Sequence, residues 1–151
     1  KGIRSYGIYS TAGTVSVTGG DITLDSNDQC YGVYAFSASE KIKVDIDGAE
    51  ISVGYGITNN KTSDTRASVG VFLATNDNTN KITLTDTNIR CYEVGVLIDG
   101  GSLDVKSTTA TPNEILTRKA SSIIVKGGSI TFDESCNYNI TSSTFNNFSR
   151  I

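Results

Sequence analysis

The stretch "VSVTGGDITL", residues 15–24, decides between two folds. Apolar residues alternate with polar ones on both sides of a Gly-Gly pair. Alternation with a period of two is typical of a β-strand that buries one face. Gly-Gly suits the left-handed turn of a two-residue hairpin. The segment is therefore either a hairpin or a corner between two strands that pair with other copies of the same phrase.

The phrase recurs along the chain, which favours the corner. A later copy, "ITLTDTNIRC" (82–91), which is the third along the chain, has Asp86-Thr87 at its centre. A β-branched Thr is poor in a left-handed conformation. A hairpin would therefore not be kept in every copy, whereas pairing between copies tolerates all of them. Apolar residues hold relative positions 1, 3, 8 and 10 in each further copy, namely "VDIDGAEISV" (44–53), "ITLTDTNIRC" (82–91), "IIVKGGSITF" (123–132) and, as a fifth match, "VLIDGGSLDV" (96–105).

A second phrase precedes most copies and gives the length of the repeat. It reads YGIY (6–9), YGVY (31–34), VGVF (69–72) and VGVL (94–97), and its glycines are 25, 38 and 25 residues apart. The longer spacing predicts a surface-loop insertion near 57–68, and a second insertion is expected near 106–120. The strand register stays open around 54–70 and 94–105.

These repeats predict one all-β segment over residues 1–151, a right-handed parallel β-helix, or solenoid, with coils of about 25 residues or more. Three short strands per coil would stack about 4.8 Å from those of the next coil. A β-sandwich, built from similar short strands, is the alternative. Because the repeat is already running at Tyr6, we expect the chain to be part of a longer protein.

The composition of the chain argues against several kinds of binding partner and catalytic site. A net charge of -3, from 13 basic and 16 acidic residues, gives no field that would attract nucleic acid. No apolar run reaches the roughly 20 residues of a membrane-spanning helix. The absence of His excludes Ser-His and Cys-His nucleophile pairs. We therefore expect no nucleic-acid partner, no membrane insertion, no cofactor and no enzyme activity.

Acidic residues offer one weak candidate for a cation site. Asp45 and Asp47 share a strand face with Lys43, and carboxylate oxygens suit hard cations. The equivalent outward positions in other copies are mostly Ser, Thr and Lys, so no acidic cluster forms across copies. A solvated, charge-balanced face is the simpler interpretation, and we predict no metal and no catalytic residue. A carbohydrate-active enzyme of the polysaccharide lyase or hydrolase type, or its glycan-binding fragment, is the alternative.

The Gly-aromatic phrase predicts an apolar stripe on the outside of the molecule. Alternation places Ile8, Val33, Val71 and Val96 inward and sends Tyr9, Tyr34, Phe72 and Leu97 outward. Aromatic side chains give a large contact area at a low entropy cost, which suits binding of a glycan, a peptide or a neighbouring domain. Stacking between copies, covered in part by a loop insertion, is the alternative explanation.

The three cysteines leave their disulfide state open. Cys91 holds the inward repeat position of Leu24 and Val53, so we predict a small buried hydrophobe there. Because the chain has three cysteines, Cys30, Cys91 and Cys136, at least one thiol has no disulfide partner within the chain. Cys30 and Cys91 lie more than one coil apart, which disfavours a disulfide between them. Sequons at 60, 139 and 147 are glycan acceptors only if the protein is secreted from a eukaryotic cell.

With "VTGGDITL" and "VKGGSITF" set between strands like "YGIY", residues 6–132 resemble the passenger regions of bacterial autotransporters and related surface adhesins. The resemblance implies export, an extracellular or cell-surface location, and a role in adhesion or host contact, with no catalytic residues to carry over. We therefore expect a non-enzymatic segment that contacts a glycan, a surface protein of a host or neighbouring cell, or another copy of itself. A purely structural stalk is a further possibility.

Overall fold

The computed structural model describes residues 4–25, 29–54, 68–110, 112–118, 121–134 and 136–142. Within these ranges every regular element is a β-strand, so the all-β prediction is confirmed. The same ranges contain no helix with the length and apolar character needed to cross a bilayer.

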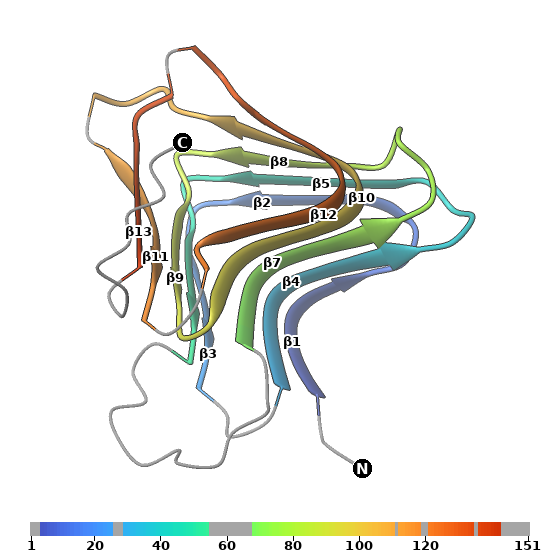
Figure 1. The fold of residues 1–151 in the computed structure, drawn as a ribbon, viewed down its shortest axis with the longest axis horizontal. Coiled ribbons are helices and arrows are strands. Elements are labelled where there is room, and N and C mark those ends of the chain that lie inside the picture. Colours follow the sequence, from blue (N-terminus) through green and yellow to red (C-terminus); the bar gives the residue numbers. More distant parts are fainter. Residues whose placement is uncertain are drawn as a thin grey trace.

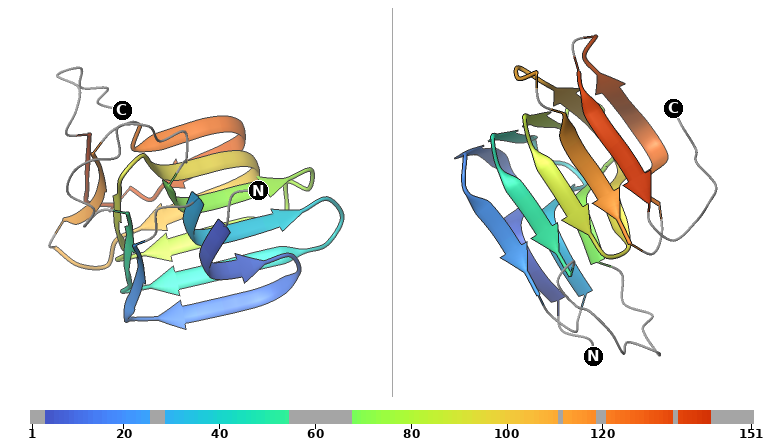
Figure 2. Two further views of the ribbon diagram at one scale, coloured as in Figure 1. Left: turned by 90° about the horizontal axis from the view of Figure 1, so that it is seen from below. Right: turned by 90° about the vertical axis from the view of Figure 1, so that its left-hand side faces the viewer.

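The strands form two parallel sheets (Figures 1 and 2). Sheet A has the order β1-β4-β7-β10-β8-β5-β2, and β12 also pairs with β10; sheet B has the order β13-β11-β9-β6-β3. Sheet A contains β1 (Arg4–Ser10), β2 (Gly13–Thr18), β4 (Gln29–Ser37), β5 (Ile42–Asp47), β7 (Ser68–Thr75), β8 (Lys81–Thr85), β10 (Val94–Lys106) and β12 (Ile123–Phe132). Sheet B contains β3 (Asp21–Leu24), β6 (Glu50–Val53), β9 (Asn88–Cys91), β11 (Asn113–Thr117) and β13 (Tyr138–Ser142).

Strands of the first three copies pair with one another, as the corner interpretation predicts. The strands on either side of Gly19-Gly20 belong to different sheets: β2 pairs with β5, and β3 pairs with β6. Val15 lies opposite Val44, and Ile22 lies opposite Ile51. The hairpin is therefore excluded. In the third copy Asp86, not Thr87, takes the left-handed conformation, with φ of 46°.

The predicted fold class, a right-handed parallel β-helix, is wrong. In place of a regular solenoid, sheet A is a single parallel sheet that curls until it is nearly closed, like a barrel, with sheet B as a second sheet. The cause lies in β10, which is one strand of 13 residues and pairs with both β7 and β8. Gly100 and Gly101, at φ of 95° and 74°, let its backbone turn inside the strand. The β-sandwich alternative is also wrong, because all strand pairs between described residues are parallel.

The copies at 96–105 and 123–132 do not occupy the same positions in the two sheets as the first three copies. Val96 lies opposite Val71, and Leu103 lies opposite Ile82. Sheet A has two halves, one formed by β1, β4 and β7 and the other by β2, β5 and β8, and β10 joins them. Gly100-Gly101 therefore turns between the two halves of sheet A, whereas Gly19-Gly20 connects sheet A to sheet B. The copy at 123–132 follows β10. The repeat alignment placed Gly100-Gly101 at the corner occupied by Gly19-Gly20, because the sequences around the two glycine pairs are similar.

The expected insertions have different outcomes. The stretch 106–120 contains a strand, β11, so a loop over this whole stretch is a wrong prediction. Its Ile115 is fully buried and lies opposite Ile89, although "NEILT" is too short to show a clear period. Of the expected insertion at 57–68, residues 57–67 lie outside the described residues.

The core lies between the sheets and consists mainly of aliphatic side chains. Cys91 is fully buried in the row of Leu24 and Val53, as predicted. Residues of the first strands, such as Ile8 and Val15, are only partly buried against this core. The inward positions of β4–β10 are the most deeply enclosed part of the molecule.

Candidate functional site

A ladder of glycines bends the first half of sheet A. A Cβ atom on Gly7, Gly32, Gly70 or Gly95 would lie 2.3–2.7 Å from the Cγ2 atom of an isoleucine in sheet B. It would also lie 2.5–2.6 Å from a backbone carbonyl oxygen, that of Gly32, Gly70, Gly95 or Ser122 respectively. Because the glycines have no such atom, β1, β4 and β7 come close to sheet B, and their outer side is concave in Figure 1.

The bend gathers aromatic rings on this outer side, which we call the aromatic elbow: Tyr6, Tyr9, Tyr31, Tyr34, Phe36 and Phe72. At Gly7 and Gly32 the tyrosine before the glycine lies in the same cluster as the tyrosine two positions after it. Tyr9 stacks on Tyr34 with ring centroids 5.4 Å apart, and Tyr34 stacks on Phe72 at 4.9 Å. The predicted stripe is thus a row of neighbouring rings. Leu97 lies opposite Phe72 and is half-buried.

Strict alternation missed the second row of rings. Tyr6 stacks on Tyr31 at 5.6 Å, and their rings meet those of the first row edge-on, with Tyr6 5.0 Å from Tyr9 and Tyr31 4.9 Å from Tyr34. A residue three positions before another cannot share its face in a straight strand. Glycine within an alternating strand was the available signal, because it marks bends and close approaches.

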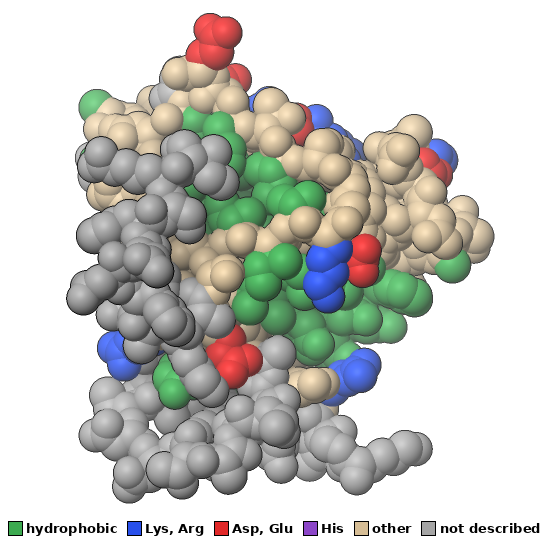
Figure 3. Space-filling view, in the orientation of Figure 1, with side chains coloured by type: hydrophobic (Ala, Val, Ile, Leu, Met, Phe, Trp, Pro, Cys, Tyr) green, Lys and Arg blue, Asp and Glu red, His purple; other side chains and the backbone are tan. Residues whose placement is uncertain are grey.

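The elbow is accessible but not uniformly so. Tyr9 is 56% exposed and Phe36 is 45% exposed, while Tyr31, Tyr34 and Phe72 are half-buried. Figure 3 shows hydrophobic side chains gathered over this side, with a few charged side chains at the margin. At the edge, the Arg4 guanidinium donates from Nε to the Gln29 side-chain oxygen at 3.0 Å. A hydrogen bond with Tyr6 raises the pKa of Arg4.

The weak cation candidate lies on the other half of sheet A. Asp45 forms an ion pair with Lys43 at 2.5 Å, and this hydrogen bond is the main reason why the pKa of Asp45 is lowered. Asp47 is exposed and lies opposite Thr85. No group of three or more acidic or cysteine side chains suited to a metal ion occurs within the described ranges.

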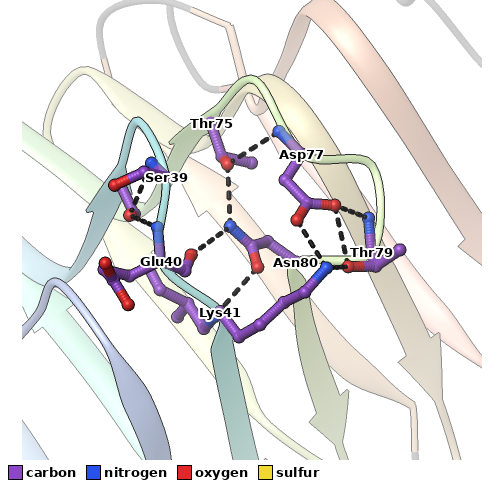
Figure 4. A network of polar contacts seen from close by, with 9 residues as sticks. Ser39, Glu40, Lys41, Thr75, Asp77, Thr79 and Asn80 are labelled. Atoms are coloured by element: carbon purple, nitrogen blue, oxygen red, sulfur yellow. Dashed lines mark hydrogen bonds and ion pairs between the residues drawn. The ribbon is translucent and has the colours of Figure 1, made fainter.

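A polar network closes the corner between the two halves of sheet A (Figure 4). The buried Asn80 side chain donates to the Glu40 carbonyl oxygen at 3.0 Å and to Thr75 Oγ1 at 2.8 Å, and it accepts from the Ile42 amide at 2.9 Å. Lys41 pairs with Asp77 at 2.5 Å and lowers the pKa of that carboxyl to about 2. These groups satisfy one another, so the network ties two stacked turns together.

The cysteines are thiols in this structure. Cys91 donates to the Ser68 carbonyl oxygen at 3.2 Å, and burial raises its thiol pKa. Cys136 is half-buried near Asp133. Of the sequon asparagines, Asn139 lies exposed on β13, while positions 60 and 147 lie outside the described residues.

Comparison with known proteins finds no relative. No protein family, no curated protein and no solved structure matches this chain. The resemblance to autotransporter passengers therefore stays a prediction, and the elbow is the feature on which a functional proposal can rest.

Proposed function

We propose that the chain is a non-enzymatic contact module, located outside the cell or at its surface, that binds a partner through the aromatic elbow. The role is adhesion or contact with a host or neighbouring cell. This location and this role rest on the sequence resemblance, and the elbow supplies a surface that fits them.

One observation carries the proposal: six aromatic side chains form one continuous outward surface on a concave face. Aromatic rings are not needed on the outside of a sheet to bury its core, because the core already has aliphatic side chains on the inner face. Tyrosine side chains combine a large apolar area with a hydroxyl group, and they lose few rotamers when they bind. Exposed Tyr9 and Phe36 leave part of this area available to a partner.

A structural stalk is the second candidate, and the stacking itself favours it. The ring of Tyr34 lies between those of Tyr9 and Phe72, so much of its apolar area is already used within the chain. Cross-strand aromatic pairs stabilise parallel strands. If this packing were the whole purpose of the rings, replacing them would change stability and leave binding unaffected.

The test separates these roles with two matched triple variants. One carries Tyr9→Thr, Tyr34→Thr and Phe72→Thr in the elbow; the other carries Asp47→Ser, Thr85→Ser and Lys106→Ser, a row on the other half of sheet A. Labelled chains are applied to cultured epithelial cells and to an array of pectin, alginate and cell-surface glycans, at a temperature where circular dichroism shows both variants folded. We expect the elbow variant to lose binding and the control variant to keep it.

Two results would contradict the proposal. Equal binding by the unchanged chain and the elbow variant would leave the rings with a packing role only. Release of new reducing ends or unsaturated sugars from any polysaccharide would show an enzyme.

A further inference from the structure

We propose that the tyrosines of the aromatic elbow form an oxidative cross-linking site, in which each stacked pair, Tyr9 with Tyr34 and Tyr6 with Tyr31, is converted to dityrosine. The oxidant is hydrogen peroxide, used by a haem peroxidase. The product joins β1 to β4 through carbon–carbon bonds. This inference goes beyond the proposed function, because the reaction needs no binding partner and takes place between side chains of one chain.

The strand register aligns the members of each pair. β1 and β4 run parallel, with Tyr6 opposite Tyr31 and Tyr9 opposite Tyr34. The ring planes differ by 17° in the first pair and by 7° in the second, at centroid distances of 5.6 Å and 5.4 Å. Side chains at opposite positions of parallel strands leave the backbone in the same direction. The carbon atoms next to the two hydroxyl groups, which are the atoms that couple in dityrosine, are therefore neighbours across the stack.

The electrostatics of the hydroxyl groups agree with this alignment. Burial raises the pKa of Tyr31, and the hydroxyl group of Tyr6 raises it further. Burial also raises the pKa of Tyr34, with further contributions from the hydroxyl groups of Tyr6, Tyr31 and Tyr9. The two hydroxyl groups of each stacked pair thus lie on the same side of the molecule and close to each other.

Edge-to-face contacts connect the two pairs into one block. Ring centroids lie 5.0 Å apart for Tyr6 and Tyr9, 4.9 Å apart for Tyr31 and Tyr34, and 5.1 Å apart for Tyr6 and Tyr34. An unpaired electron passes readily between phenol rings in contact, so oxidation of any of these tyrosines reaches both stacked pairs. Phe72, which stacks on Tyr34 at 4.9 Å, ends this path because a phenylalanine ring is much harder to oxidise.

Atoms and electrons balance with one molecule of hydrogen peroxide per link. Each phenol loses one electron and one proton and becomes a neutral phenoxyl radical. The two radicals couple through a new bond between their ortho carbons, and the hydrogens on these carbons move as protons to the phenoxyl oxygens, which restores both phenols. Hydrogen peroxide accepts the two electrons and two protons and leaves as two molecules of water. Rings already held side by side need no diffusional encounter before they couple.

The link adds a covalent tie where the chain has no disulfide. All three cysteines are thiols, and β1 pairs with β4 through its backbone. A bond between Tyr9 and Tyr34 closes a loop one repeat long, and cross-links stabilise a fold mainly by restricting the unfolded chain. The midpoint of thermal unfolding should therefore rise by roughly 5–10 °C.

The experiment oxidises the folded 151-residue chain, at low micromolar concentration, with hydrogen peroxide and a haem peroxidase. Dityrosine is measured by its fluorescence. A protease that cleaves before aspartate then separates residues 1–20 from residues 28–44, and each of these fragments carries one member of both pairs. We expect the two fragments to be joined, with a mass lower by two hydrogen atoms per link. Tyr138, which hydrogen-bonds to the backbone of Thr87, is an internal control and should stay unlinked.

Two matched double variants test whether stacking decides the reaction. The first carries Tyr6→Phe and Tyr31→Phe, so one stacked pair of phenols remains. The second carries Tyr6→Phe and Tyr34→Phe. Its two remaining phenols, Tyr9 and Tyr31, belong to different strands and different rows. Both variants keep every ring and the same number of phenols, and we expect severalfold more dityrosine within the first.

Three results would overturn the inference: equal yields from the two double variants, a link from either fragment to the fragment of Tyr138, or products that are mainly dimers. Dimers would show coupling between two copies of the chain. If the unchanged chain forms no dityrosine while the elbow triple variant still loses cell binding, only the cross-linking site is wrong.

Discussion

The two halves of sheet A share one core, but their outer surfaces differ in chemistry: one is aromatic and the other is polar. On the inside, both present buried aliphatic rows, for example Val33 with Val71 and Val44 with Ile82. On the outside, β1, β4 and β7 carry stacked rings, whereas β2, β5 and β8 carry Ser, Thr, Lys and Asp. The strands of the aromatic half bend, and those of the polar half are straight (Figure 1). The core therefore does not dictate the outer surface, and the bend at the glycines decides which of the outward rings meet.

The bend has an energetic consequence as well as a geometric one. It brings residues three positions apart, such as Tyr31 and Tyr34, onto one side and into edge-to-face contact at 4.9 Å. Aromatic pairs of this kind contribute about 0.5–1.5 kcal/mol each. On the polar half the outward contacts are ion pairs such as Lys43 with Asp45, which are partly exposed and contribute about 0–1 kcal/mol. Substitutions at the bend, at the corner and on both outer surfaces test this difference.

The largest effect should come from Gly70→Ala, which attacks the bend. The new Cβ would lie 2.5 Å from both the Gly95 carbonyl oxygen and Ile89 Cγ2, so backbone and core must shift, at a cost of about 3 kcal/mol or more. Gly19→Ala, at a left-handed corner with free space around it, should cost roughly 1 kcal/mol. Urea unfolding of both variants measures the difference, and equal losses would show that the bend does not depend on close approach.

Asn80→Ala attacks the corner that joins the two halves. It removes three hydrogen bonds and leaves the buried amide of Ile42 and the carbonyl oxygen of Glu40 without this partner. Unsatisfied buried groups of this kind cost about 1–3 kcal/mol each, so we expect a loss of about 2–4 kcal/mol in thermal or urea unfolding. Asn78→Ala, in the same turn but exposed, is the control and should change stability by less than about 0.5 kcal/mol.

Tyr34→Thr compared with Asp45→Thr measures the two outer surfaces directly. Tyr34 contacts five other rings, so its loss should cost about 1–3 kcal/mol. Asp45 contributes mainly through its ion pair with Lys43, so its loss should cost less than about 1 kcal/mol. Thr suits a strand in both places. Equal destabilisation in urea would mean that the stacking adds nothing beyond strand pairing.

The smallest effects should be the pH dependences, one of which acts at the corner and the other on the aromatic half. The pKa of Asp77 is lowered from 3.8 to about 2, so its stabilising effect is present above pH 3.8 and is lost as the pH falls toward 2. Burial raises the pKa values of Tyr31 and Tyr34 above 10.0. Their effect is present below pH 10 and is lost as the pH rises through the folded-state values.

Stability measured between pH 2 and 12 checks both signs. Asp77→Asn should flatten the acid limb and leave the alkaline limb unchanged, while Tyr34→Phe should weaken the alkaline limb alone. A variant that changed both limbs would show that the corner and the aromatic half are coupled.

Individual residues show how far the sequence can be interpreted. The positions of Val15, Val17, Ile22 and Leu24 were correctly predicted to recur and to pair with later copies, because period-two alternation depends only on the strand itself. The rings of Tyr9, Tyr34 and Phe72 stack in one row in the structure, and Tyr9 is 56% exposed. Tyr6 and Tyr31 were missed, because the bend at Gly7 and Gly32 reverses the alternation and is created by the approach of sheet B.

The amino-acid sequence was enough to predict an all-β chain, a repeat whose copies pair in parallel, and a row of outward aromatic side chains. All three follow from local spacing of apolar and polar residues. Tertiary packing, in contrast, sets the course of β10, which runs unbroken through Gly100-Gly101 and joins two rows of strands into one nearly closed sheet. Another Gly-Gly pair, Gly19-Gly20, forms the corner after β2. Which corner each pair makes depends on the strands already stacked beneath it, and that information is not local.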